Sequence, residues 1–157
     1  MDFNDTPEEA KFRSEAREWL TANARQRDTS NAKASVSNKS EAERLVRAKQ
    51  WQALKAEAGY AAITWPTEYG GRGGTSIQSV IYSQEEANFD VPRGFFEIGL
   101  GMCIPTMMKW ATPEQNERYV KPALFGEEVW CQLFSEPAAG SDVAGLRTKC
   151  ERDGDDW

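Results

Sequence analysis

The segment FSEPAAGSDVAG, residues 134–145, contains the residue types that could hold an anionic ligand. Gly140 can adopt a positive φ angle and lets a ligand approach the backbone, and the amide groups that follow can point together at an anion. Ser141 adds a hydroxyl donor, and Asp142 can cap a short helical turn. The same composition is also typical of a surface connection between two elements. The residues alone leave both interpretations open.

Other stretches are weaker candidates for chemistry. The glycine-rich run GGRGG, residues 70–74, lacks the Gly-Lys-Ser/Thr of a P-loop, and it does not follow a strand as a dinucleotide fingerprint would. We interpret it as a tight crossover that lets helices pack closely. The pairs Glu85/Glu86 and Glu127/Glu128 could suggest acid–base catalysis, but adjacent residues on a helix do not face one another. A solvated helix face is the interpretation that we prefer for both pairs.

Composition excludes several classes of function. The sequence has no histidine, which removes Ser-His-Asp and Cys-His catalysis and every histidine-ligated metal site. Its three cysteines, Cys103, Cys131 and Cys150, are far apart, so neither a disulfide framework nor a zinc site is expected. A net charge of −6 argues against non-specific binding to nucleic acid or to an anionic membrane. We therefore expect a soluble, cytoplasmic protein with no nucleic-acid, membrane or metal partner.

Five helical segments must position these residues. Thr6 with Glu9 and Ser40 with Glu43 have the spacing of capping boxes. Phe12, Ala16, Trp19 and Leu20 then form one apolar stripe, as expected for a helix that packs on one side. The expected helices run from Thr6 to about Asn23, from Ser40 to Gly59, from Thr75 or Ser76 to about Phe89, over residues 95–111 with a kink or restart at Pro105, and from Thr112 to about Phe125. Between the first two helices, the polar residues 27–39 predict a flexible loop.

The character of the sequence changes at Gly126. Residues 128–135 are enriched in strand-forming types, and residues 146–152 could form a second strand. Helices before this point and strands after it predict two successive domains, a helical domain at 1–126 and the beginning of a β-domain at 127–157. Two strands make no stable sheet alone, so we interpret the sequence as a piece of a larger protein.

The order of three segments resembles the acyl-CoA dehydrogenase family. These are WPTEYGG, then PTMMKWATPEQNERYVKPALFGEE, then WCQLFSEPAAGSDVAGLRTKCERDGDDW, and the match continues in register from about Phe12. The resemblance implies a mainly α chain: the multi-helix N-terminal domain of that family, followed by the first strands of a β-barrel-like middle domain. It also implies that a C-terminal four-helix domain follows in the whole protein, with FAD between the middle and C-terminal parts.

The resemblance also assigns site residues. Those expected to contact FAD, at its isoalloxazine ring or its pyrophosphate, are Gln132, Phe134, Ser135, Gly140 and Ser141. Those expected to wall the pocket for the acyl chain are Gly99, Leu100, Cys103 and Ile104.

The family's chemistry is α,β-desaturation of an acyl-CoA thioester. A glutamate removes the α-proton, and the resemblance places this base beyond residue 157, so no catalytic residue is expected in this chain and the fragment alone should be inactive. Electron-transfer flavoprotein or a similar acceptor, and a homo- or hetero-oligomer, are the implied partners. An alternative is a non-catalytic helical subunit or interaction module of the same family.

Overall fold

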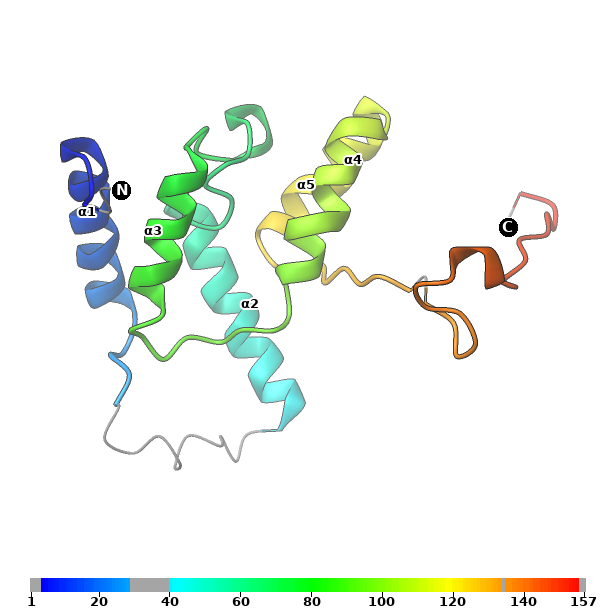
Figure 1. Cartoon of the computed structure of the whole chain (residues 1–157), viewed down its shortest axis with the longest axis horizontal. Helices are drawn as coiled ribbons and strands as arrows, with labels where there is room; N and C mark the ends of the chain where they lie inside the picture. The colour runs from blue at the N-terminus through cyan, green and yellow to red at the C-terminus, as the bar shows by residue number, and fades with distance from the viewer. Residues whose placement is uncertain (1–3, 29–39, 134, 156–157) are drawn as a thin grey trace.

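The computed structural model describes residues 4–28, 40–133 and 135–155. The described α-helices lie between Pro7 and Leu124, and an extended segment follows them (Figure 1). The α-helices are α1 (Pro7–Asn23), α2 (Glu41–Glu57), α3 (Ser76–Glu86), α4 (Ile104–Trp110) and α5 (Pro113–Leu124). The shorter turns are the 3₁₀-helices η1 (Thr67–Tyr69) and η3 (Val143–Gly145) and the π-helix η2 (Gly99–Cys103). None of the described helices has both the length and the apolar character that crossing a bilayer requires.

Capping boxes fix where the helices begin. In α1, the Glu9 amide donates to the Thr6 hydroxyl, and the Thr6 amide donates to the Glu9 carboxylate at 2.7 Å. Helices α2, α3 and α5 begin in the same way, which confirms the predicted starts. Helix α2 ends two residues earlier than predicted, because Gly59 adopts a φ of +75° and the Tyr60 amide returns to the Lys55 carbonyl.

The apolar stripe of α1 packs against α3. Ala16, Leu20 and Ile81 are almost completely buried there. Aromatic rings extend this core towards α2, and Tyr60 stacks on Tyr82 with ring centroids 4.8 Å apart. The predicted stripe on the first helix is thus confirmed, and the remaining rings join three helices into one core.

An ion cluster also joins α1 to α3. The carboxylate of Glu85 is only 5% exposed and accepts hydrogen bonds from Arg17 Nε at 2.8 Å, Arg17 Nη2 at 2.9 Å and Arg13 Nη1 at 3.1 Å. The interpretation of Glu85 as part of a solvated face is therefore wrong. Arg13 and Arg17 are one helical turn apart on α1, so both guanidinium groups can reach the same carboxylate.

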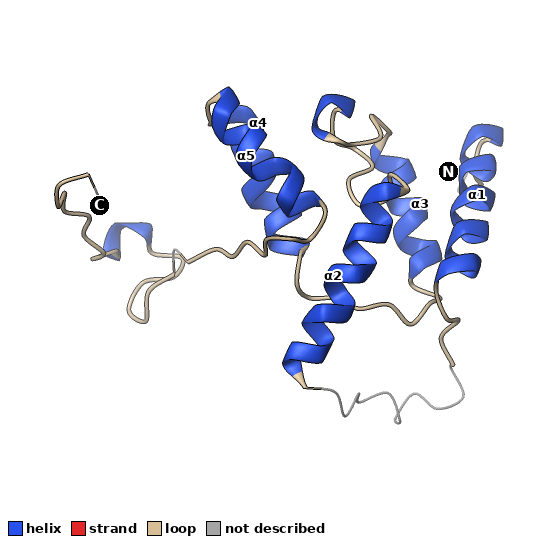
Figure 2. Cartoon of the chain, turned by 180° about the vertical axis from the view of Figure 1, so that it is seen from behind, coloured by secondary structure: helices blue, strands red, loops and turns tan. Residues whose placement is uncertain are grey.

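A second core lies between α4, α5 and the crossover at residues 60–74. Helices α4 and α5 lie side by side as a pair beside the other three (Figures 1 and 2). The glycine-rich run packs into this region: a Cβ atom on Gly71 would lie 2.2 Å from the Trp65 carbonyl oxygen, and one on Gly70 would lie 2.8 Å from Leu124. These close approaches support the crossover interpretation of GGRGG.

A kink or restart of the helix was predicted at Pro105. Instead, the helix adopts the wider π form in the turn before this proline. In η2 the Ile104 amide donates to the carbonyl of Gly99, five residues back. Proline has no amide hydrogen, and in a regular α-helix its ring clashes with the carbonyl four residues before it, here that of Gly101. A wider π turn relieves this conflict, and the chain continues into α4.

After α5 the described chain extends away from the helices (Figures 1 and 2). Residues 128–133, 135 and 146–152 form no strand in this structure, although strands were predicted at 128–135 and 146–152. Leu133 is 89% exposed, so this segment lacks a partner surface. Strand geometry depends on hydrogen bonds to a neighbouring strand, and the described residues supply none here. The mainly α fold is confirmed, whereas the beginning of a β-domain is not.

Candidate functional site

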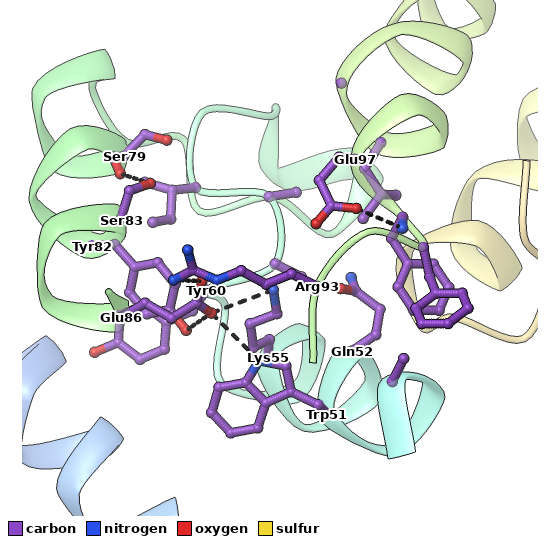
Figure 3. Close-up of a pocket in the computed structure, with 18 of the residues that line it drawn as sticks. Trp51, Gln52, Lys55, Tyr60, Ser79, Tyr82, Ser83, Glu86, Arg93 and Glu97 are labelled. Carbon is purple, nitrogen blue, oxygen red and sulfur yellow. Dashed lines mark hydrogen bonds and ion pairs between the residues drawn. The ribbon is translucent and has the colours of Figure 1, made fainter. Parts of the chain in front are cut away.

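A cavity of about 330 Å³ opens between α2, α3 and residues 92–101 (Figure 3). Part of its wall is apolar, and this part consists of Ala48, Trp51, Ala62, Ile63, Trp65, Phe96 and Leu100. Polar and charged side chains line the rest, mainly from the last turns of α2 and α3. Pockets that bind small molecules combine walls and polar groups in this way.

Glu86 lies at the centre of the polar part. Its side chain is 13% exposed, and Oε1 accepts hydrogen bonds from Trp51 Nε1 at 3.4 Å and from the Tyr82 hydroxyl at 3.2 Å. Lys55 Nζ lies 3.6 Å from Oε1, and Arg93 Nη2 lies 3.5 Å from Oε2. Figure 3 shows these groups converging on Glu86 from three separate segments of the chain. The interpretation of Glu86 as a solvated residue is wrong, because the carboxylate is an organising group of the cavity.

Tyr82 is held neutral in this cluster. Burial raises the pKa of its phenol far above the usual range, and the negative charge of Glu86 and the hydrogen bond to it raise it further. The phenol is therefore neutral near pH 7 and donates its hydrogen bond to Glu86.

A second carboxylate borders the cavity at Glu97. Burial alone would raise the pKa of this group, but hydrogen bonds from the backbone amides of Gly94, Glu97 and Phe96, together with the charge of Lys55, lower it overall. The Gly94 amide donates to Oε1 at 2.7 Å and the Phe96 amide to Oε2 at 3.0 Å. Two carboxylates and two cations, Lys55 and Arg93, thus balance the charge of the lining.

The residues predicted to wall the acyl pocket lie in and beside η2, but they do not all face one space. Leu100 lines the cavity together with Gly101. Gly99 is buried against Trp130, and Ile104 is fully buried in the core between α4 and α5. Cys103 is half-buried, and its thiol donates to the Cys131 carbonyl at 3.8 Å.

The segment predicted to contact FAD forms a loop apart from this cavity. Phe134 lies outside the described residues, Gln132 is half-buried, and Ser135 is exposed. Gly140 and Ser141 are exposed, and their amides, with that of Asp142, make no backbone hydrogen bond within the described part of the chain. Three successive amides and a hydroxyl therefore have no backbone partner within the described residues, but Gly140 does not adopt the positive φ angle that the sequence allowed.

Glu136 holds the two ends of this loop together. Its carboxylate accepts hydrogen bonds from the Arg147 amide at 2.9 Å, from the Thr148 amide at 2.6 Å and from the Thr148 hydroxyl. The Glu136 amide in turn donates to the Ala139 carbonyl at 2.9 Å. These bonds lower the pKa of Glu136, with the Thr148 hydroxyl as the largest cause. The loop thus has an internal brace that sequence reasoning did not assign.

Sequence reasoning also missed Lys55, Glu86 and Glu97 as a group, because they come from three segments. One local signal was available: Tyr82 and Glu86 are four residues apart on one helix and share a face. Within the described residues, no group of three cysteine or acidic side chains is placed to hold a metal ion.

Comparison with known proteins agrees with this helical architecture. Residues 6–127 match the family model described as acyl-CoA dehydrogenase, N-terminal domain. The chain belongs to the acyl-CoA dehydrogenase family. It is 34% identical over 147 residues to acyl-CoA dehydrogenase IpdE1 of Mycobacterium tuberculosis, covering 94% of this chain and 38% of that protein. It is 44% identical over 106 residues to acyl-CoA dehydrogenase FadE34 of the same organism, covering 68% of this chain and 15% of that protein.

Solved structures of the family superimpose on nearly the whole chain. The ChsE4–ChsE5 complex from Mycobacterium tuberculosis matches with a TM-score of 0.68 and 27% identity, over 99% of this chain and 37% of that one. The Tcur3481–Tcur3483 steroid ACAD matches with a TM-score of 0.67 and 25% identity, over 99% of this chain and 38% of that one. The chain therefore corresponds to the N-terminal portion of acyl-CoA dehydrogenases and spans under two-fifths of the length of these relatives.

Proposed function

We propose that this chain is the N-terminal part of an FAD-dependent acyl-CoA dehydrogenase, and that the whole protein desaturates an acyl-CoA thioester between its α- and β-carbons. The match of residues 6–127 to the family's N-terminal domain carries this proposal. In the whole protein, residues 1–126 would form the helical domain and residues 127–157 would open a barrel-like β-domain. From the sequence composition we also propose a cytoplasmic protein.

The loop at residues 135–145 offers donors that would suit part of FAD. Free amides at Gly140 and Ser141, and the Ser141 hydroxyl, suit the oxygens of a pyrophosphate. We propose that they hold this part of FAD, and that Gln132, Phe134 and Ser135 contact its flavin ring. When bound, FAD would supply the acceptor for the hydride that leaves the β-carbon. The α-proton would pass to a glutamate that this chain does not contain.

The acyl group would lie against η2, where Leu100 lines the cavity. We propose that Gly99, Cys103 and Ile104, which do not line this cavity, belong to the acyl pocket of the whole protein. One related structure is that of a steroid ACAD, so we propose a ring-bearing acyl group as the substrate. Electron-transfer flavoprotein or a similar carrier would reoxidise the flavin.

Two related structures, ChsE4–ChsE5 and Tcur3481–Tcur3483, each pair two differently named proteins, which favours a hetero-oligomer for the whole protein. The same observation supports a second candidate function, in which this chain belongs to a non-catalytic subunit of such an assembly.

The test is to express the complete reading frame that contains this chain, with and without any family member encoded beside it. Flavin absorbance that is bleached by an acyl-CoA, with formation of the enoyl-CoA, is expected for the first candidate. The second candidate predicts a folded protein that forms a complex but holds no flavin of its own. The 157-residue chain alone is expected to be colourless and inactive; tight FAD binding and turnover by this chain would contradict that expectation.

A further inference from the structure

Lys55 places an ammonium group in the lining of the cavity, and its N–H donors are not used by hydrogen bonds within the described residues. Its side chain is 18% exposed, and its ion pair with Glu86 spans 3.6 Å. Among the described residues the ammonium makes no hydrogen bond, although it carries three N–H donors. Buried charged groups in proteins are ordinarily both paired and hydrogen-bonded. Lys55 is ion-paired with Glu86 but makes no hydrogen bond within the described residues.

The two carboxylates beside Lys55 are already engaged elsewhere. Glu86 Oε1 accepts from Trp51 and Tyr82, and Arg93 lies beside Oε2. Both oxygens of Glu97 accept backbone amides. The Lys55 side chain is 18% exposed, and within the described residues its N–H donors remain available to a molecule that enters the cavity. Figure 3 shows the ammonium directed towards Glu86.

The cavity continues from this ammonium to the predicted acyl wall. Leu100 belongs to the predicted wall and lines the same cavity as Lys55, and Phe96 and Trp65 add to its apolar surface. A hydrocarbon that lies against Leu100 would thus reach the polar cluster with its far end. A volume of about 330 Å³ falls at the small end of the range for ligand pockets, roughly 300–1,000 Å³.

We propose that the cavity receives the far end of the acyl group, and that Lys55 donates a hydrogen bond to a neutral oxygen, a ketone or a hydroxyl, carried there. This inference rests on the proposed function and adds the substrate's distal chemistry to it. The oxygen is neutral because two cations already balance two carboxylates in the lining. A carboxylate on the substrate would add an uncompensated negative charge to a partly buried site, which is costly.

The test uses the 157-residue chain with no flavin and no coenzyme A. The probes are 2-decalone and 2-methylenedecalin, which differ in one oxygen that is replaced by a CH₂ group of similar size. Binding is followed by tryptophan fluorescence, since Trp51 and Trp65 line the cavity. The variant is Lys55→Met, which keeps the length of the side chain and removes its charge, and the matched control is Lys11→Met on the exposed side of α1.

The wild-type chain and the Lys11→Met control should bind the ketone about tenfold or more tightly than the methylene analogue, as expected for a hydrogen bond from a charged donor. Lys55→Met should abolish this preference and leave binding of the methylene analogue almost unchanged. Equal binding of the two probes to the wild type, binding of neither, or a preference that survives in Lys55→Met would overturn the proposal. Where Lys55→Met is unfolded, the wild-type comparison still tests whether the cavity prefers a neutral oxygen, and equal binding of the two probes overturns the proposal.

Decalin-2-carboxylate provides a third arm, and tighter binding of this anion than of the ketone would overturn the choice of a neutral oxygen. Since none of these measurements involves turnover, a failure of the proposed desaturation would leave their result intact. Conversely, active dehydrogenase whose chain shows no ketone preference would refute this inference alone.

Discussion

Removal of the charge on Glu85 tests the role of the α1–α3 ion cluster. In Glu85→Gln, the carboxamide keeps one acceptor oxygen but turns an NH₂ group towards the guanidinium groups of Arg13 and Arg17. Breaking a buried ion pair from one side costs about 3–5 kcal/mol. The side chain of Arg17 is 61% exposed, so water can replace part of what this arginine loses. We therefore expect the free energy of unfolding to fall by about 2–3 kcal/mol, and Tm by about 5–10 °C.

The effect should depend on pH with a definite sign. Hydrogen bonds from Arg17, the largest cause, and then from Arg13 lower the pKa of Glu85 below its ordinary value of 4.5, against the opposing effect of burial. The stabilisation is therefore fully present above pH 4.5 and is lost as the pH falls through the lower pKa of the folded state. The wild type and Glu85→Gln should converge in stability as the pH is lowered.

The assay is urea denaturation followed by far-UV circular dichroism, in a pH series that descends from pH 7. Glu117→Gln, at an exposed position on α5, is the matched control and should change the stability little. If Glu85→Gln resembles this control at pH 7, or if its deficit stays constant down to the acid range, the assignment of Glu85 as a stabilising ion-pair centre is refuted.

Two further predictions concern the crossover and the loop. Gly71→Ala places a Cβ atom 2.2 Å from the Trp65 carbonyl oxygen and should lower the free energy of unfolding, measured by urea denaturation, by about 1–3 kcal/mol. The control is Gly101→Ala, whose Cβ atom meets no atom within 4 Å and should not destabilise the chain. Equal effects of the two variants would contradict the close packing at Gly71. Glu136→Gln should accelerate hydrogen exchange at the Thr148 amide. Because the hydrogen bonds lower the pKa of Glu136, the wild-type protection should itself be lost as the pH falls below 4.5, and exchange that is insensitive to both changes would exclude the brace.

The sequence by itself determined the helices and their starting points. A capping box is a local structure of four residues, so the spacing of Thr6 and Glu9, or of Ser40 and Glu43, was enough to predict it. The apolar stripe of α1 could also be predicted from the sequence, since side chains three or four residues apart on a helix share one face. The order of the motifs also identified the family that the comparisons support.

The strands at 128–135 and 146–152 show the opposite case. Their composition favours β-structure, but a strand is stable only when a neighbouring strand forms hydrogen bonds with it. The local sequence does not show whether such a neighbouring strand is present. The π turn before Pro105 was predictable in part. The proline indicated that the helix would be irregular near this position, but the type of irregularity depended on the surrounding helix.

Only the tertiary structure decided the surroundings of the charged residues. Glu85 and Glu86 are neighbours in sequence and lie on different faces of α3, so one is enclosed by the arginines of α1 and the other by Trp51, Lys55 and Arg93. Burial and ion pairing depend on segments that are up to 72 residues away, and no local pattern encodes them. The cavity arises where three such segments meet, and for that reason its lysine could be recognised only in the folded chain.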